Sequence, residues 1–580
     1  MVSYAERPWL EHYDPGVPRS LKPYPDKAAF ELLDDAVKEV GDKAACITSV
    51  DLPLFGRRHA SISYRELGEE SDRLAGALAA MGLQKGDRVG VLFPNSVQFV
   101  LAWFAIAKAG GIVVALNPSF PPAKYAEQLV DADIKIVIAM SLFYKGINSV
   151  REATPVEKVI VSNYKEYLPG IGKFLFTLAV EKKEGHYVES LRPGDVWLQD
   201  LLTQYAPEQR PQVDIDPRED TVIFQYTGGT TGVPKAARGP HSALVSNAYQ
   251  MMYWMDLGED FEDRSLAAIP LFHVYGMVAV MLLSVQVGAT MIMVPNARDI
   301  DDVLGVIDMF KPTRFMGVPA LYNAINFHPD VVAGKYDLSS IRACISGSAP
   351  LAPETKRRFE ELTGGKVMEG FGMSEAPTAT HCNPMQGVNK VGSIGLPFPD
   401  NDCQIVSLDD GKTILPVGEV GELVMRGPVM MTGYHNMPTE TANALREMDD
   451  GNKWLFTGDI ARMDEEGYFF IVDRKKDMVL IGGFNVYPNN VEKVMVEHEG
   501  IAEAAVAGIP HPEKEGQETL KAWVVRTAGS TVTADEIIDY CSGKLAPYEV
   551  PRRIDFVDEL PKTAVGKILR RELVKMEVDG

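Results

Sequence analysis

Short apolar runs rich in β-branched residues alternate with longer helical patterns from about residue 88 onward. The apolar runs cover 88–93, 111–117, 135–140 and 158–162. Between them, 96–109 and 122–132 have the apolar spacing of helices. Strands that alternate with helices are typical of parallel sheets covered by helices. The pattern therefore predicts an α/β fold, and the lack of a short-period repeat argues against a solenoid.

The pattern changes at the charged run 473–477, which separates two strand-like segments. Beyond it, 503–510 and 520–526 are typical of strands, and a helical pattern begins at Ala534. We predict a large N-terminal domain, 1–472, of parallel-type sheets and a small α+β domain, 473–580. The charge run on its own is equally consistent with a solvated turn.

One apolar stretch, 277–295, is long enough to be considered as a membrane span. Ser284, Gln286, Gly288 and Thr290 interrupt it. We therefore predict a buried helix that ends near Gly288, followed by a short buried strand at 291–294, and no transmembrane helix.

Composition and charge exclude several classes of protein. The 580 residues are 46% hydrophobic and 24% charged, as in a globular chain of two to four domains. With 58 Lys and Arg against 80 Asp and Glu, the net charge is −22, which argues against a nucleic-acid binder. The five cysteines are scattered without a C-x-x-C pair, and the N-terminus lacks the apolar core of a signal peptide. We expect a cytoplasmic protein.

The segment 163–202 combines an apolar patch, 174–180, with nearby lysines at 173, 182 and 183. Such a patch is compatible with contact to a membrane surface, at the inner face of the membrane for a cytoplasmic protein. Because the apolar stretch is short, a surface helix packed on its own domain is the favoured interpretation.

The segment 226–235 follows a strand-like run and has the character of a phosphate-binding loop. Its glycines allow backbone N–H groups to approach an anion, its hydroxyls add donors, and a lysine supplies positive charge. The residues concerned are Thr227, Gly228, Gly229, Thr230, Thr231, Gly232 and Lys235. The spacing differs from that of a Walker loop, because Val233 and Pro234 separate the last glycine from the lysine.

This loop resembles the signature of the adenylate-forming superfamily, and further motifs of that superfamily follow in order along the chain. Segment 346–351 is similar to its adenine-side loop, with Gly347, Ser348, Ala349 and Pro350. Segment 369–375 is similar to its aromatic-Gly-x-Thr-Glu motif, with Glu369, Gly370, Phe371, Gly372, Met373, Ser374 and Glu375. Thr457–Asp459 and Arg474 resemble its ribose contacts, and 561–567 its terminal motif with the catalytic Lys567.

The residue types suit these roles. Glu375 is a hard oxygen ligand for Mg²⁺, with Thr230 as a second candidate, although a carboxylate after a turn is often merely exposed. Asp459 can accept hydrogen bonds from ribose hydroxyls, cap the following turn, or do both. Lys567 in its Gly-flanked loop is a cation that can reach a carboxylate and an α-phosphate. Ser374 stands where the superfamily usually has threonine and keeps the hydroxyl.

The resemblance also implies how the parts work together. The large domain would bind ATP and the acid, and the small domain would swing between an adenylating and a thioester-forming pose. Lys476 matches the pivot, and Gly482, Gly483 and Phe484 match a loop presented to CoA. His273, Gly317 and Val318 match the surroundings of the acyl pocket, with a structural core histidine as the alternative for His273.

The insert 163–202 and the linker 473–492 resemble those of bacterial long-chain fatty acyl-CoA synthetases. The resemblance implies AMP-forming ligation of a fatty acid to CoA, with ATP, Mg²⁺ and CoA as cofactor and co-substrates. Medium-chain, branched or cyclic acids stay open, as does an acyl-AMP ligase that delivers to a carrier protein. A non-catalytic nucleotide- or acyl-binding protein is the remote alternative, and a homodimer is compatible with the sequence.

Overall fold

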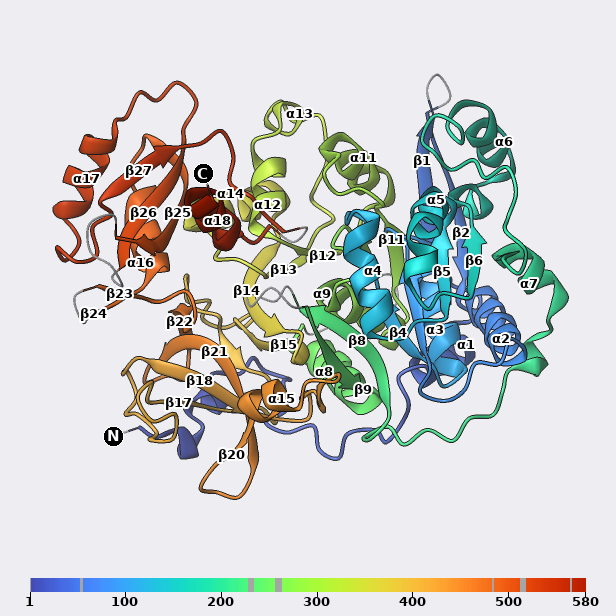
Figure 1. The fold of residues 1–580 in the computed structure, drawn as a ribbon, viewed down its shortest axis with the longest axis horizontal. Helices are drawn as coiled ribbons and strands as arrows, with labels where there is room; N and C mark the ends of the chain where they lie inside the picture. Colours follow the sequence, from blue (N-terminus) through green and yellow to red (C-terminus); the bar gives the residue numbers. More distant parts are fainter. Residues whose placement is uncertain are drawn as a thin grey trace. The chain divides into compact units, whose positions relative to one another are not determined.

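The computed structural model describes residues 2–52, 56–227, 234–255, 263–481, 484–511, 518–563 and 566–579. They fall into two compact units, each described here by itself (Figure 1). The large unit comprises His12–Asn401 and Arg426–Leu445, and the small unit comprises Met1–Glu11, Asp402–Met425 and Arg446–Gly580. The 473–580 domain predicted from the sequence lies within the small unit, and its boundary stays a prediction.

One sheet of the large unit is parallel in its centre and antiparallel at both edges. Its strand order is β16 (Leu396–Pro397), β15 (Ala376–Cys382), β14 (Lys366–Met373), β13 (Ala343–Ser346), β12 (Arg314–Gly317), β10 (Arg264–Ala267), β11 (Thr290–Met293), β1 (Ala44–Leu52) and β2 (Gly56–Ser63). The helices α11 (Ile300–Phe310), α12 (Pro319–Asn326), α13 (Pro329–Val332) and α14 (Pro353–Thr363) follow its strands in the chain. Their apolar side chains pack with those of β12 and β13 into one buried core.

The second sheet of the large unit contains all the strands predicted between residues 88 and 162. Its order is β19 (Gly433–Tyr434), β9 (Lys235–Pro240), β8 (Thr221–Thr227), β4 (Ile112–Ala115), β3 (Arg88–Leu92), β5 (Ile136–Met140), β6 (Lys158–Ser162) and β7 (Val196–Trp197). The predicted runs pair in parallel with one another, which confirms the α/β prediction. The helices α4 (Pro122–Asp131) and α5 (Ser141–Val150) join its strands, and α6 (Gly170–Ala179), α7 (Leu198–Gln204) and α8 (His241–Trp254) follow.

The helix α3 (Val97–Lys108) lies in the interior of the large unit, beside α1 (Glu31–Val40) and α2 (Tyr64–Ala80). All of its residues are buried, as expected for a helix that is apolar on every side. Its terminal Lys108 is buried as well, and its Nζ pairs with Asp72 at 2.8 Å and Asp34 at 3.2 Å. The pairing satisfies a charge that would otherwise be costly to bury.

The small unit is dominated by antiparallel strands, which the sequence pattern did not predict as a sheet of their own. One sheet has the order β17 (Asp402–Val406), β18 (Gly421–Arg426), β21 (Lys453–Met463) and β20 (Leu445–Glu447), with β22 (Phe469–Arg474) paired to β21. Another has the order β25 (Ile501–Pro510), β26 (Glu518–Arg526) and β27 (Arg553–Phe556), beside the hairpin of β23 (Val479–Ile481) and β24 (Phe484–Val486). The helices are α16 (Pro488–Val496), α17 (Ala534–Ser542) and α18 (Arg570–Asp579), while α15 (Pro438–Ala444) belongs to the large unit.

The apolar stretch 277–295 folds inside the large unit as a helix followed by a strand, as predicted. The helix begins with α9 (Val274–Gly276), continues as a π-helix over Met277–Leu282 and ends with α10 (Leu283–Gln286). The next strand, β11, is buried in the first sheet. Among the described residues, no helix is both long and apolar enough to cross a bilayer.

Candidate active site

The carboxyl ends of three parallel strands bring the predicted motifs of the large unit together. The register pairs Gly317 of β12 with Ser346 of β13, and Ser346 with Glu369 of β14. Val318 and the 347–350 segment follow β12 and β13 at this edge, and residues 370–373 continue β14 beyond its pairing with β13. Ligands of α/β sheets bind at this edge, because the loops after parallel strands converge there.

The ring of Tyr275 connects the predicted acyl pocket to the predicted adenine-side loop. Its hydroxyl donates to the carbonyl oxygen of Ile345 at 2.8 Å and lies 3.3 Å from that of Gly317. A Cβ on Gly347 would stand 3.2 Å from the Tyr275 ring, closer than nearly all real contacts. Glycine at 347 therefore lets the backbone pass directly over this ring.

The loop 346–350 turns from the buried strand to the surface. The Ser346 hydroxyl oxygen is buried without a hydrogen-bond partner among the described residues. Ser348 has φ +72°, a left-handed conformation that is uncommon for serine, and it is exposed together with Pro350. Ala349 between them is half-buried. Such local strain is frequent at ligand-binding loops.

The 369–374 segment leaves the parallel sheet and continues as an antiparallel pair with β15. Glu369 is buried, and its Oε1 accepts a hydrogen bond from the N–H of Gly392 at 2.9 Å. A Cβ on Gly372 would lie 1.4 Å from the carbonyl oxygen of Thr378, so only glycine fits there. The remaining residues of the segment are only partly buried, and they are Gly370, Phe371, Met373 and Ser374.

Glu375 and Lys235 both contact the side chain of Tyr434. The Tyr434 hydroxyl donates to Glu375 Oε1 at 2.7 Å, and Lys235 Nζ lies 5.4 Å from the centre of the Tyr434 ring. Desolvation and the Glu375 carboxylate raise the pKa of Tyr434, so its hydroxyl stays protonated and keeps donating. Tyr434 thus orients the carboxylate through its hydroxyl and contacts the lysine cation through its ring.

The phosphate-binding loop predicted from the sequence connects two paired strands. Thr227 ends β8 and Lys235 begins β9, and the two are register partners. Tyr226 beside them donates to Asp131 at 2.6 Å, which fixes the end of β8 to α4. Gly228, Gly229, Thr230, Thr231 and Gly232 lie outside the described residues, so the structure positions only the two ends of this loop.

His273 lies at the start of α9, immediately before the π-helix. Its Nδ1 accepts a hydrogen bond from the N–H of Tyr275 at 3.3 Å, which places the ring proton on Nε2. Desolvation lowers the pKa of His273 to about 4, so the ring is neutral at pH 7. A neutral ring with its proton on Nε2 is suited to donate a hydrogen bond to an oxygen. A π-helix beside it is itself frequent at functional sites.

In the small unit, β21 and β22 place Asp459 and Arg474 opposite each other. The Arg474 Nε lies 3.2 Å from Asp459 Oδ1, and the two residues are register partners. Asp459 Oδ2 is buried and has no hydrogen-bond partner among the described residues. An unpaired buried carboxylate oxygen is costly unless a ligand donates to it. A pair of ribose hydroxyls would supply such donors.

Lys567 lies close to the same pair. Its backbone N–H donates to the Thr563 hydroxyl at 3.1 Å and its carbonyl accepts from the Thr563 N–H at 2.8 Å, which closes a tight loop. Desolvation and the cations of Arg474 and Lys476 lower the pKa of Lys567 to about 7, while Asp459 and Asp477 oppose this shift. The fold therefore gathers residues that are far apart in sequence around one lysine.

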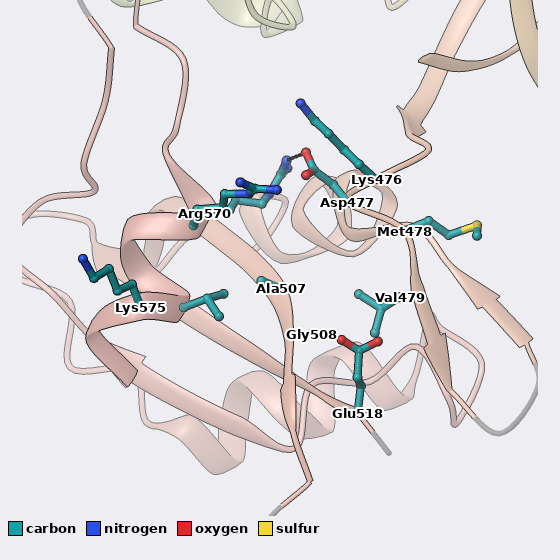
Figure 2. A pocket seen from close by; sticks show the side chains of 11 residues that line it. Lys476, Asp477, Met478, Val479, Ala507, Gly508, Glu518, Arg570 and Lys575 are labelled. Atoms are coloured by element: carbon teal, nitrogen blue, oxygen red, sulfur yellow. Dashed lines mark hydrogen bonds and ion pairs between the residues drawn. The ribbon is translucent and has the colours of Figure 1, made fainter. Parts of the chain in front are cut away.

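Lys476, the predicted pivot, borders a cavity of about 410 Å³ in the small unit. Figure 2 shows this cavity, with the Arg570 guanidinium directed at the Asp477 carboxylate. Arg570 also pairs with Glu492 at 2.6 Å, so it ties α18 to both the 474–478 turn and α16. Partial desolvation and the Arg474 cation lower the pKa of the outward-facing Lys476 to about 8.

The predicted CoA loop is described at one residue only. Gly482 and Gly483 lie outside the described residues. Phe484 is 55% exposed and stacks on Tyr548, with ring centres 4.5 Å apart and planes inclined by 8°. The exposed face of this pair is compatible with a further flat group stacking on it.

The lowered pKa of Lys567 predicts a pH dependence. If the cation is required, kcat/KM for ATP in pyrophosphate release falls as pH rises through about 7, by roughly tenfold per unit. Lys476→Gln removes a repelling cation, so it raises the pKa of Lys567 and moves this limb to higher pH. Lys475→Gln is the matched control, because Lys475 pairs with Glu422 at 2.8 Å. Coincident profiles for wild type and Lys476→Gln would contradict this coupling.

Three residues that contribute to these clusters were not singled out from the sequence. Tyr434 is brought to Glu375 by the pairing of β19 with β9, and Tyr275 contacts the carboxyl edge of the first sheet at Ile345. Arg570 follows Lys567 by three positions and pairs with Glu492. Tyr434 had no signal beyond its position next to Gly433, whereas Tyr275 stands two residues after His273 in the segment that matches the surroundings of the acyl pocket. Arg570 could have been singled out, because it is a charged residue that closely follows the 561–567 motif.

Comparisons with known proteins identify the family of the chain. Residues 33–435 match the family of AMP-binding enzymes, and 490–567 match the C-terminal domain of that family. The chain is 39% identical over 576 residues to a long-chain-fatty-acid–CoA ligase of Bacillus subtilis, covering 99% of each chain. A relative with the same name in Yersinia pestis is 35% identical, covering 99% of this chain and 98% of its own.

Solved structures of similar fold include other ligase structures. The fold is similar to that of ATP-bound MatB from Rhodopseudomonas palustris, with a TM-score of 0.79 and 29% sequence identity. This similarity covers 95% of the present chain and 99% of the other. Because the family similarity and the relatives span nearly the whole sequence, the chain belongs to the family of AMP-binding enzymes.

Proposed function

We propose that the protein is an AMP-forming acyl-CoA synthetase that activates a long-chain fatty acid. The similarity to a long-chain-fatty-acid–CoA ligase over 99% of both chains is the observation that carries this proposal. The charged residues that the chemistry needs are all present, which argues against a decayed, non-catalytic binding protein. They are Lys235, Glu375, Asp459, Arg474 and Lys567.

The first step is the attack of the acid carboxylate on the α-phosphorus of ATP. A P–O bond forms to the acid, the bond to the pyrophosphate leaving group breaks, and an acyl-adenylate results. The substrate is its own nucleophile, so the protein aligns the reactants and offsets charge. Lys235 and the 227–232 loop bind phosphate oxygens, Asp459 accepts from the ribose, and Lys567 donates toward the reacting carboxylate and α-phosphate.

The residues fit a magnesium ion held mainly by the nucleotide. Among the described residues no group of three His, Cys, Asp or Glu side chains could bind a metal ion by itself. Glu375 has one oxygen fixed by Tyr434, which leaves the other for a cation. Mg²⁺ typically takes one or two carboxylates plus substrate phosphates, and when bound it offsets the charge of the leaving pyrophosphate. Thr230 remains a second candidate ligand.

The second step is the attack of the CoA thiol on the acyl carbon, with departure of AMP. The acyl-adenylate is a mixed anhydride, so water has to be excluded until the thiol arrives. We assign the change between the two steps to a rotation at Lys476, because hinges absorb backbone change at few residues. Gly482, Gly483 and Phe484 are the residues proposed to approach CoA.

The acid itself is proposed to lie near His273, Gly317 and Val318. Val318 packs at the edge of the apolar core of the first sheet, and the Nε2–H of His273 is suited to the carboxylate oxygen. One methylene contributes only about 1–3 kcal/mol in an apolar pocket, so a preference for chain length has to come from several contacts.

The test is acyl-CoA formation with ATP, Mg²⁺ and CoA across acids from acetate to oleate, with benzoate and cyclohexane carboxylate included. We expect the highest kcat/KM for acids of long chain, with AMP and pyrophosphate released together. A maximum at small or cyclic acids would keep the mechanism and overturn the long-chain assignment. Pyrophosphate release without thioester, restored by a carrier protein, would identify an acyl-AMP ligase. Light scattering on the same sample tests the homodimer.

A further inference from the structure

Arg570, the first residue of α18, lies at the centre of a buried network in the small unit. Its side chain is 15% exposed, and its guanidinium donates to both carboxylate oxygens of Glu492, at 2.9 Å and 2.6 Å. It also donates to Asn489 Oδ1 and lies 3.4 Å from Asp477 Oδ2, a contact drawn in Figure 2. Binding several acceptors in one plane requires the rigid fork of arginine.

The loop that carries Lys567 is closed at its base immediately before Arg570. The N–H of Leu569 donates to the carbonyl oxygen of Pro561 at 2.8 Å, and the next pair of residues inward forms an antiparallel bridge. The closed base continues directly into α18. An anchor at Arg570 therefore sets the position from which the Lys567 side chain extends.

The partners of Arg570 belong to α16 and to the turn at the predicted pivot. Asp477 is part of this turn, and the N–H of Asn489 in α16 donates at 2.8 Å to the buried Asp473, where the turn begins. Glu492 is itself held by a backbone N–H of β25, which donates to its Oε1 at 2.7 Å. Arg570 thus ties the lysine loop to the turn and to two elements packed beside it.

The charged groups that act on Lys567 lie in and beside the same turn. Besides burial, the cations of Arg474 and Lys476 lower the pKa of Lys567, while the carboxylates of Asp459 and Asp477 oppose them. The strength of each interaction depends on the distance between the lysine loop and the turn. Arg570 joins these two segments, so it controls that distance.

We propose that Arg570 is a positioning residue for adenylation, which holds Lys567 beside Asp459 and Arg474. The guanidinium is bound by protein carboxylates, so it acts through Lys567 and not on a substrate. This role rests on the proposed assignment of Lys567 to the first step. A displacement of about 1 Å can lower a rate by roughly 10²-fold, so loosening of the loop is measurable.

The test is Arg570→Lys in the full chain, which keeps the charge and loses the fork. At saturating ATP, single-turnover release of pyrophosphate is expected to slow by roughly tenfold to a hundredfold, while the half-saturating ATP concentration changes by less than about threefold. Thioester formation from supplied acyl-adenylate is expected to stay within about threefold of the wild type. Arg553→Lys is the matched control, because Arg553 pairs with Glu577 near the other end of α18 at 2.8 Å. This control is expected to match the wild type in both half-reactions.

The pH profile of pyrophosphate release is a readout that a merely structural role would not move. In Arg570→Lys the loosened Lys567 is less buried and farther from Arg474 and Lys476, so its pKa rises above about 7. The limb on which the rate falls with increasing pH is therefore expected to move to higher pH. In Arg553→Lys this limb is expected to stay in place.

A second variant shows whether the contact itself matters. Glu492→Gln removes the paired charge and keeps the size of the side chain, so it is expected to slow adenylation as well. The double variant is expected to be no slower than the slower single variant, because both changes act on one contact. Multiplied effects would overturn the proposal. An unchanged rate and pH limb in Arg570→Lys would also overturn it, as would equal loss of both half-reactions, which would indicate a role in folding.

Lys567→Ala, measured beside these variants, separates the positioning role from the catalytic assignment. If Lys567→Ala releases pyrophosphate at the wild-type rate, the assignment of Lys567 to adenylation fails, and the role of Arg570 fails with it. If Lys567→Ala is slow while Arg570→Lys keeps the wild-type rate and pH limb, only the positioning role is overturned.

Discussion

Lys567→Ala is expected to lower the rate of acyl-adenylate formation by roughly 10²–10³, the range for losing one preorganised donor at a developing charge. The structure places this lysine beside Asp459 and Arg474, the candidate ribose pair, and its pKa is lowered by burial and then by the cations of Arg474 and Lys476. The phosphates of bound ATP would offset the repulsion between these cations and Lys567. The interaction between Lys567 and bound ATP is therefore expected to be strong. Single-turnover release of pyrophosphate from ATP and fatty acid measures the effect directly.

The same variant separates the two half-reactions. Thioester formation from supplied acyl-adenylate and CoA is expected to stay within a few-fold of the wild type, because Lys567 is assigned to the first step. Lys562→Ala is the matched control, since this lysine of the same motif pairs with Glu503 at 2.6 Å on the surface. If both half-reactions fail in Lys567→Ala, the assignment to adenylation is wrong.

Glu375→Ala is expected to cost roughly 10²-fold in turnover, together with a raised requirement for Mg²⁺. The carboxylate is positioned by the Tyr434 hydroxyl at 2.7 Å, and the Lys235 cation lies 5.4 Å from the centre of the Tyr434 ring. Loss of the carboxylate removes the protein's oxygen ligand for the ion and leaves the other ligands to the nucleotide and water. Initial rates across a titration of Mg²⁺ at saturating ATP measure both changes.

Tyr434→Phe is the control for this variant, because it removes only the hydroxyl that orients Glu375. One hydrogen bond to a charged group contributes about 1.5–3 kcal/mol, so its loss should lower turnover by less than the loss of the carboxylate. An unchanged Mg²⁺ dependence in Glu375→Ala would remove Glu375 from the metal site. A larger loss in Tyr434→Phe than in Glu375→Ala would show that the tyrosine has a role of its own.

Much of the large unit could be predicted from local patterns. The parallel strands β3, β4, β5 and β6 follow from short apolar runs, because strands covered on both faces need apolar residues at every position. The end of the helix near Gly288 could also be predicted, because glycine interrupts a helical pattern. In the structure Gly288 has φ +60° and lies between the helix and β11. The antiparallel sheet of the small unit could not be predicted in this way. Its strands β17, β18 and β21 are joined by long connections, so no local pattern indicates that they pair.

The candidate residues show the same division. Lys235, Glu375, Asp459 and Lys567 were visible as residue types within motifs, because charged groups in Gly-containing loops suit phosphate and ribose. Their neighbours were not visible. Tyr434 reaches Glu375 because β19 pairs with β9, and Asp459 faces Arg474 because β21 pairs with β22.

The sequence by itself determined the α/β class, the order of the motifs and the identity of the charged groups, because local periodicity and side-chain chemistry are properties of nearby residues. Tertiary structure alone decided that Gly317, Ser346 and Glu369 lie in one row, and that burial together with Arg474 and Lys476 lowers the pKa of Lys567. Register and electrostatic coupling depend on distances between segments far apart in the chain. Those distances are set by the packing of whole sheets, which no local pattern encodes.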